Sequence, residues 1–174
     1  LYGGLPSMWT EGALTLARSG DFLTLWNDDR LAPDQSQVFL QAVNTDGSVD
    51  FVPNGVAASA PTGADQFIAG AKVLPNDQVV VVWNDRRTGM YNLYAQLLDP
   101  QGNRLWNETG VQLSDYGDGW DSYVQIGQVG LDILIGWTHL EYSDQNNQGD
   151  IRLQRISGGQ PLWGMNGICP INDT

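Results

Sequence analysis

The nine residues Val79-Val-Val-Val-Trp-Asn-Asp-Arg-Arg87 return elsewhere in this chain of 174 residues. They match Phe22-Leu-Thr-Leu-Trp-Asn-Asp-Asp-Arg30 closely and Ile133-Leu-Ile-Gly-Trp-Thr-His139 more distantly. The tryptophans of these segments lie 57 and 54 residues apart. Self-similarity at a nearly fixed period of this size is the sequence signature of a repeat architecture.

Two further elements recur in the same register. Each segment is followed by an apolar run that contains a glutamine, and then by a glycine, an aromatic residue four positions later and a second glycine eight positions later. In order of the three copies, the members are Gln41, Gln96 and Gln154; Gly47, Gly102 and Gly159; Phe51, Trp106 and Trp163; and Gly55, Gly110 and Gly167. The copies differ in length between these elements, as insertions in repeat proteins do in their loops.

Each copy is predicted to form four short strands. In the second copy the runs 67–74, 78–83, 93–98 and 104–113 are apolar or alternating, and turn-forming residues separate them. The 17 Asp against 3 Glu also suit turns better than helix surfaces. We predict an all-β fold of four-stranded antiparallel β-propeller blades of about 55 residues, one repeat region over 1–174 with blades near 12–57, 65–113 and 121–170.

Composition excludes several classes of protein. A net charge of −12 with one lysine provides no basic footprint for nucleic acid. The apolar runs are far shorter than the roughly 20 residues that span a bilayer, so no membrane insertion is expected. One cysteine cannot form an internal disulfide, and one histidine cannot build a multi-histidine metal site. A first residue of Leu1 suggests a processed or excised piece.

The second copy resembles a known tandem repeat. The matching residues are Thr62-Gly-Ala-Asp-Gln-Phe67, the run 79–86, Asn92-Leu-Tyr-Ala-Gln-Leu-Leu-Asp99, Gly102-Asn-Arg-Leu-Trp106 and Gly110-Val. Repeats of this kind occur in large secreted or cell-surface proteins of Bacteroidetes and other environmental bacteria. The resemblance implies a propeller and an extracellular or cell-surface setting, and it implies no particular reaction.

Charged residues follow the repeated tryptophan in two of the copies, as Asp28 and Arg30 and as Asp85 and Arg86. At one end of a propeller, these carboxylate and guanidinium groups are candidates for ligand binding. Alternatively, each Asp caps a turn, and Arg pairs with it or stacks on an aromatic ring. Repetition favours the structural alternative, because packing needs such residues in every blade and a ligand site needs them once.

The loop before the third copy offers a different set of candidates. Tyr116 and Trp120 beside Asp121 form the arrangement that stacks on the apolar face of a sugar, or they close a gap between blades. Asp115, Asp118 and Asp121 place several oxygen ligands within a few residues, which suits calcium. The alternative for these carboxylates is a solvated turn, because the segment does not match the EF-hand pattern.

Signals for catalysis are few. His139 stands where the other copies have Asp, but no nucleophile motif accompanies it. Glu11, Glu108 and Glu141 could each join an Asp as a glycosidase pair, provided that the two carboxyls lie about 5–9.5 Å apart. Sequence alone does not supply that distance.

The leading hypothesis is a non-enzymatic binding or scaffolding module of a secreted or cell-surface protein, because every strong signal is repeated. The alternatives are a carbohydrate-binding lectin and a fragment of a sialidase-like glycoside hydrolase. Closed propellers hold about four to eight blades, so three blades leave open edges. We expect a protein partner, self-association or a longer chain to complete the ring. A glycan is the other expected partner, and calcium is the one cofactor considered.

Overall fold

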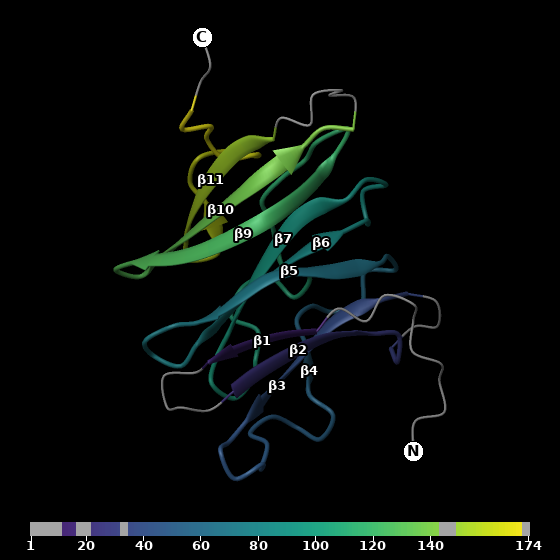
Figure 1. Cartoon of the computed structure of the whole chain (residues 1–174), viewed down its shortest axis with the longest axis vertical. Coiled ribbons are helices and arrows are strands. Elements are labelled where there is room, and N and C mark those ends of the chain that lie inside the picture. Colours follow the sequence, from purple (N-terminus) through teal and green to yellow (C-terminus); the bar gives the residue numbers. More distant parts are fainter. Residues whose placement is uncertain (1–11, 17–21, 32–34, 143–148, 172–174) are drawn as a thin grey trace.

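The computed structural model describes residues 12–16, 22–31, 35–142 and 149–171. These residues form three four-stranded antiparallel sheets, each with its strands in sequence order. The sheets follow one another along the long axis of the molecule (Figure 1). The prediction of an all-β chain with three four-stranded antiparallel units is therefore confirmed. Nothing in the described ranges forms a helix that could cross a membrane.

The three sheets, here called units 1 to 3, divide the chain as the repeats do. Unit 1 contains β1 (Gly12–Leu16), β2 (Phe22–Asp28), β3 (Gln37–Val43) and β4 (Val56–Ala57). Unit 2 contains β5 (Gln66–Val73), β6 (Val79–Asp85), β7 (Asn92–Leu98) and β8 (Val111–Gln112). Unit 3 contains β9 (Trp120–Val129), β10 (Asp132–Leu140), β11 (Asp150–Ser157) and β12 (Gln160–Pro161).

The fourth strand of unit 2 is shorter than the sequence predicts. Instead of a strand over 104–113, the structure has the two-residue β8, preceded by an isolated bridge between Leu98 and Arg104. Gly102 and Gly110 both have positive φ. The chain therefore turns twice in this stretch and cannot stay extended.

The repeated glutamine has the same contacts in all three units. Its Oε1 accepts a hydrogen bond of 3.0 Å from the backbone N–H of the repeated aromatic residue, and its Nε2 donates to the carbonyl of the next residue. Gln41, Gln96 and Gln154 are all buried. A buried amide must be paired on both sides, so this position fixes the loop that leads into the fourth strand.

The second repeated glycine lies against the tryptophan of its own unit. A Cβ atom on Gly55 would come within 2.6 Å of Cη2 of Trp26, and one on Gly110 within 2.5 Å of Cη2 of Trp83. Both glycines also have positive φ. Only glycine meets both requirements, which explains why the residue recurs in register.

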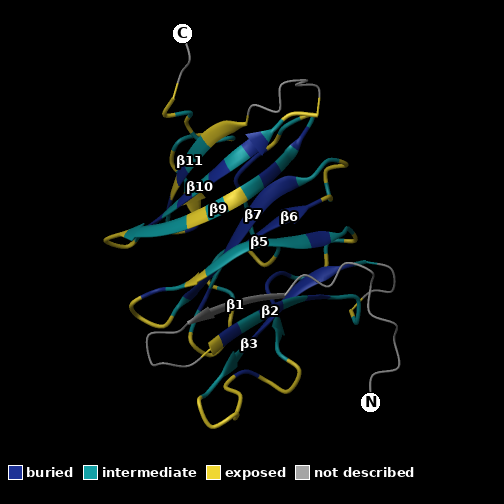
Figure 2. Ribbon diagram, in the orientation of Figure 1, coloured by how far each residue is buried: buried dark blue, intermediate teal, exposed yellow. Residues whose placement is uncertain are grey.

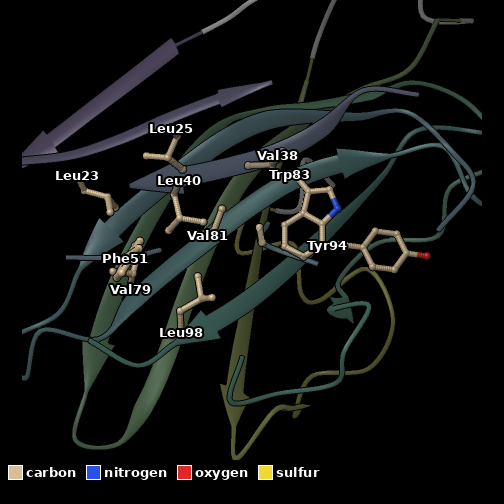
Figure 3. Packing of buried hydrophobic residues seen from close by; sticks show 11 residues of the cluster. Leu23, Leu25, Val38, Leu40, Phe51, Val79, Val81, Trp83, Tyr94 and Leu98 are labelled. Carbon is tan, nitrogen blue, oxygen red and sulfur yellow. The ribbon is translucent and has the colours of Figure 1, made fainter. Parts of the chain in front are cut away.

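Two apolar layers hold the three sheets together. Side chains of β6 alternate between them: Val79 and Val81 join the layer against unit 1, which Figure 3 shows, and Val80 and Val82 join the layer against unit 3. Every residue of β6 is buried, as the dark blue strand in Figure 2 shows. The first strands of the units are neighbours as well, since β5 contacts both β1 and β9.

Candidate functional site

The residues singled out in the sequence gather at one end of the three sheets, here called the candidate end. Asp28 and Asp85 are the last residues of β2 and β6. Trp120 and Asp121 begin β9, whose start pairs with the end of β10. Antiparallel pairing thus brings the ends of second strands and the starts of first strands to the same edge.

In unit 1, Asp28 accepts hydrogen bonds from the indole Nε1 of Trp26 at 3.1 Å and from Arg30 through its backbone N at 2.8 Å and its Nε at 2.7 Å. The Arg30 guanidinium also lies 4.4 Å from the centroid of the Phe39 ring. Burial raises the pKa of Asp28, but the hydrogen bonds from Arg30 and Trp26 lower it more, so its pKa lies below the usual value. Asp28 therefore remains a carboxylate in this arrangement.

In unit 2, Asp85 repeats this arrangement in a fully buried position. It accepts hydrogen bonds from Trp83 Nε1 at 3.1 Å and from Gln66 Nε2 at 2.9 Å. Its arginine partner is Arg87, which donates from its backbone N at 2.9 Å and from its guanidinium and lies 3.9 Å over the Tyr94 ring. A ligand could reach Asp85 only by displacing these partners. These contacts match the alternative in which the Asp has a structural role and the Arg pairs with it and stacks on an aromatic ring.

Polar side chains at the candidate end also join consecutive units. Asn27 of unit 1 donates to the carbonyl of Gln66 in unit 2. Asn84, the equivalent residue of unit 2, donates to the carbonyl of Asp121 in unit 3 at 2.9 Å. A serine adds a second link at each junction: Gln66 Nε2 donates to Ser59 Oγ at 2.7 Å, and Ser114 Oγ donates to Asp121 Oδ2 at 2.5 Å. Much of the polarity at this end is therefore structural.

Unit 3 departs from this pattern. His139 occupies the place of Asp28 and Asp85, and its Nδ1 lies 2.9 Å from Asp121 Oδ1. The Tyr116 ring stacks on the imidazole at a centroid distance of 3.6 Å. Burial raises the pKa of the Tyr116 hydroxyl well above its usual range, so the phenol stays neutral. Asp121 is itself buried, and both of its oxygens are engaged by Ser114 and His139.

The aromatic residues at the junction of units 2 and 3 form a second departure. Tyr91, which precedes β7, packs edge-on against Trp120 at 4.8 Å, and Phe67 of β5 lies 5.7 Å from Tyr91 and 6.4 Å from Trp120. The Arg86 guanidinium lies 5.6 Å from the Tyr91 ring. The three rings are half-buried and Arg86 is exposed. We call Phe67, Tyr91, Trp120 and Arg86 the aromatic platform.

The aromatic platform is not part of the repeated packing. Strand register makes Ser36 the equivalent of Tyr91, and Asp65 the equivalent of Trp120. At the junction of units 1 and 2 these residues form a polar contact, in which the Ser36 backbone N donates to Asp65 Oδ1 at 3.0 Å. Sequence reasoning missed Phe67 and Tyr91, although an alignment of the three copies contains the signal, an aromatic residue where the first copy has serine.

A hollow of about 320 Å³ adjoins the aromatic platform and shares Arg86 with it. Its other lining residues are Gln35, Gly63, Ala64 and Asp65. The hollow therefore combines a carboxylate, a guanidinium and an amide, which can donate and accept hydrogen bonds on neighbouring hydroxyl groups.

The remaining candidates are the metal ligands and the glutamates expected from the sequence. Within the described ranges, no three His, Cys, Asp or Glu side chains are grouped closely enough to hold a metal ion, so calcium at Asp115, Asp118 and Asp121 stays a prediction. Glu108 pairs with Arg104 at 2.8 Å on the loop before β8. Glu141 is exposed just after β10, and Glu11 lies outside the described residues.

Comparison with known proteins gives a likeness of fold. The chain matches no protein-family model and no curated protein sequence. Among solved structures, it is similar to the crystal structure of an endo-arabinase from Bacteroides thetaiotaomicron, with a TM-score of 0.52 and 11% identity over 91% of this chain. The chain spans 62% of the length of that structure. At this identity the likeness extends to the fold alone.

Proposed function

We propose that the chain supplies three blades of a β-propeller that acts as a non-enzymatic binding module, with carbohydrate as its ligand at the aromatic platform. The observation that carries this proposal is that the polar contact of the first junction, Ser36 with Asp65, is replaced at the second junction by the Tyr91 and Trp120 rings. At the first junction, the polar pair is enough for the two units to pack against each other. A change to half-buried aromatic rings at the second junction therefore points to a ligand.

The propeller proposal is supported by the sameness of the two junctions. At each junction, an asparagine donates a hydrogen bond to a backbone carbonyl of the next unit, and a serine hydroxyl forms a hydrogen bond with the side chain at the equivalent position of that unit. An apolar layer lies between the two sheets. A fixed set of contacts rotates each unit by a similar amount relative to the last, which is how blades build a ring. Completion of the ring requires further blades from a longer chain, a partner or a second copy.

A carbohydrate ligand suits the chemistry of the aromatic platform. Half-buried aromatic rings present apolar faces on which the C–H groups of a sugar stack. Arg86 and Asp65 supply a donor and an acceptor for hydroxyl groups in the adjoining hollow. A neutral sugar fits better than a polyanion because the chain carries a net charge of −12. The endo-arabinase of similar fold is consistent with a carbohydrate ligand, but it provides no residue match.

Binding rather than turnover is proposed because several carboxylates at this end are engaged structurally. Asp28, Asp85 and Asp121 each accept several hydrogen bonds within the sheets. Asp65 accepts one from the Ser36 backbone. None of these interactions provides the two free, facing carboxyls that glycoside hydrolysis uses.

A glycan array, probed with and without calcium, tests the proposal. We expect binding to neutral glycans, and a loss of about tenfold in affinity for Trp120→Ala and for Arg86→Gln. Phe22→Ala is the matched control, since Phe22 is an exposed aromatic residue at the opposite end of β2. Arg86 is exposed, so its variant should fold normally. No array binding, or equal losses in Phe22→Ala and Arg86→Gln, would refute the carbohydrate proposal. Turnover of a chromogenic glycoside would refute its non-enzymatic part.

A further inference from the structure

The residue two positions after the repeated tryptophan accepts hydrogen bonds in units 1 and 2. There the carboxylates of Asp28 and Asp85 each accept the indole N–H of their tryptophan at 3.1 Å, and each also accepts a guanidinium N–H. Unit 3 has His139 at this position. The acceptor has been lost while the tryptophan donor, Trp137, has stayed.

Three polar atoms near this position have no hydrogen-bond partner among the described residues. They are Nε1 of Trp137, Nε2 of His139 and Nε of Arg152, and all three atoms are buried. The Trp137 and His139 residues are only 2% and 3% exposed. Trp137 and Arg152 are direct cross-strand neighbours on β10 and β11. Buried donors without a partner are rare in folded proteins, because each has lost its hydration without compensation. We call these three residues the unit-3 donor cluster.

The unpaired N–H groups of the unit-3 donor cluster favour a guest that accepts hydrogen bonds. His139 Nδ1 lies 2.9 Å from Asp121 Oδ1, so a proton on Nδ1 fills that hydrogen bond and Nε2 is the ring nitrogen left for a guest. The Arg152 guanidinium lies 5.8 Å from the Tyr116 ring, which itself stacks on His139. The charged groups around the imidazole are Asp121, already bonded to Nδ1, the cross-strand neighbour Asp150, and Arg152, whose guanidinium is paired with Asp150.

Space at the unit-3 donor cluster is limited. The Gly119 backbone covers the imidazole so closely that a Cβ atom there would approach His139 Cε1 to 2.7 Å and Nε2 to 3.0 Å. The side chain of Arg152 is 23% exposed and gives access from solvent. A guest must therefore be small and must enter beside Arg152.

We infer that the unit-3 donor cluster binds a small carboxylate anion. The anion takes over the acceptor role that an aspartate carboxylate has in units 1 and 2. It accepts hydrogen bonds from Trp137 Nε1, from the Arg152 guanidinium, and from His139 Nε2 when that nitrogen carries a proton. This site is separate from the aromatic platform, so its test does not depend on carbohydrate binding.

Nuclear magnetic resonance of His139 provides a direct test, because the chain has a single histidine and hence a single set of imidazole signals. The protein, labelled with ¹⁵N-histidine, is titrated with sodium acetate near about pH 6, where imidazole groups are partly protonated. We expect a saturable shift of the Nε2 signal toward the protonated form. Sodium chloride at equal ionic strength and acetamide, a neutral analogue of the same shape, should leave the signal in place. An unchanged signal in acetate, or an equal shift with chloride or acetamide, would overturn the inference.

Substitutions separate this site from a general salt effect. Trp137→Phe should weaken acetate binding about tenfold by removing one donor, whereas Trp163→Phe, in the same unit, should not. The double substitution Asp121→Gln with His139→Asp rebuilds the Gln66–Asp85 arrangement of unit 2 and supplies an internal carboxylate. In the parent chain, acetate bound to the folded state should raise the melting temperature. In this double variant, acetate should no longer do so. If that variant fails to fold, Arg152→Gln provides the second measurement, with the same loss of acetate binding expected. Equal acetate affinity in Trp137→Phe and Trp163→Phe would overturn the inference.

Discussion

Asp85→Ala should be among the most damaging single substitutions in the chain. The side chain is fully buried, and its removal leaves Trp83 Nε1, one N–H of Gln66 Nε2 and the Arg87 backbone N without an acceptor. It also leaves the Arg87 guanidinium without its ion-pair partner. Each unpaired buried donor costs about 1–3 kcal/mol, and breaking a buried ion pair costs about 3–5 kcal/mol.

These contributions do not add, because water and shifted side chains recover part of the loss. We therefore expect a decrease of about 3–5 kcal/mol in the free energy of unfolding, a large share of the roughly 5–15 kcal/mol of an ordinary domain. Asp28→Ala is the matched comparison, because Asp28 has the same tryptophan and arginine partners at a more exposed place, with 17% of its side chain accessible. Water can replace the lost carboxylate there, so about 1–2 kcal/mol is expected.

Urea unfolding followed by tryptophan fluorescence measures both values. Burial predicts that Asp85→Ala loses at least about 2 kcal/mol more than Asp28→Ala. If the two variants lose the same amount, or if Asp28→Ala loses more, then burial of the carboxylate is not what makes this position important.

Three further substitutions test the repeated contacts. Burial raises the pKa of Asp28 but hydrogen bonds lower it more, so its stabilisation is complete above the unfolded value of about 3.9 and is lost as pH falls through the lower native pKa. Asp28→Asn should flatten the decline of urea midpoints with acid, and an unchanged slope would contradict this. Gly110→Ala combines positive φ with overlap of the repeated indole and should cost about 2–4 kcal/mol in thermal unfolding. Gly47→Ala, with nothing within 4 Å of its Cβ, should cost only about 1–2 kcal/mol, so equal costs would argue against the overlap. Asn84→Ala should remove about 1–2 kcal/mol and speed hydrogen exchange of the β9 amides; exchange unchanged from the parent chain would show that this link does not hold unit 3.

The sequence predicts the units well because their internal contacts are local. The repeated glutamine reaches a loop 10 residues away, from Gln41 to Phe51 in the first unit, and the second repeated glycine meets the tryptophan of its own unit. Such requirements recur at fixed spacing and are visible without a structure. The extent of the fourth strand was not predictable in the same way, because two glycines with positive φ interrupt a stretch whose composition still favours a strand.

The candidate site was predicted less well because its contacts cross between units. Nothing in the spacing indicates that Asn84 reaches Asp121, or that Phe67, Tyr91 and Trp120 meet from three separate strands and loops. The choice between two adjacent arginines was equally open. The Arg87 guanidinium donates to Asp85, whereas the Arg86 guanidinium lies over the Tyr91 ring. Only the turn after β6 decides which arginine takes which partner.

The outer face of unit 3 differs from the faces that join the units, and this constrains what could follow it. Thr138 stands where Asn27 and Asn84 form their links, and Ile171 stands where the linking serines are. The same face leaves Ile151 and Ile168 44% and 42% exposed. A further blade placed here, from this chain, a partner or a second copy, would therefore pack through apolar contact without the asparagine and serine hydrogen bonds. Apolar contact fixes orientation less strictly than hydrogen bonds do, so such a junction would hold its two blades in place less strictly than the two described junctions hold their units.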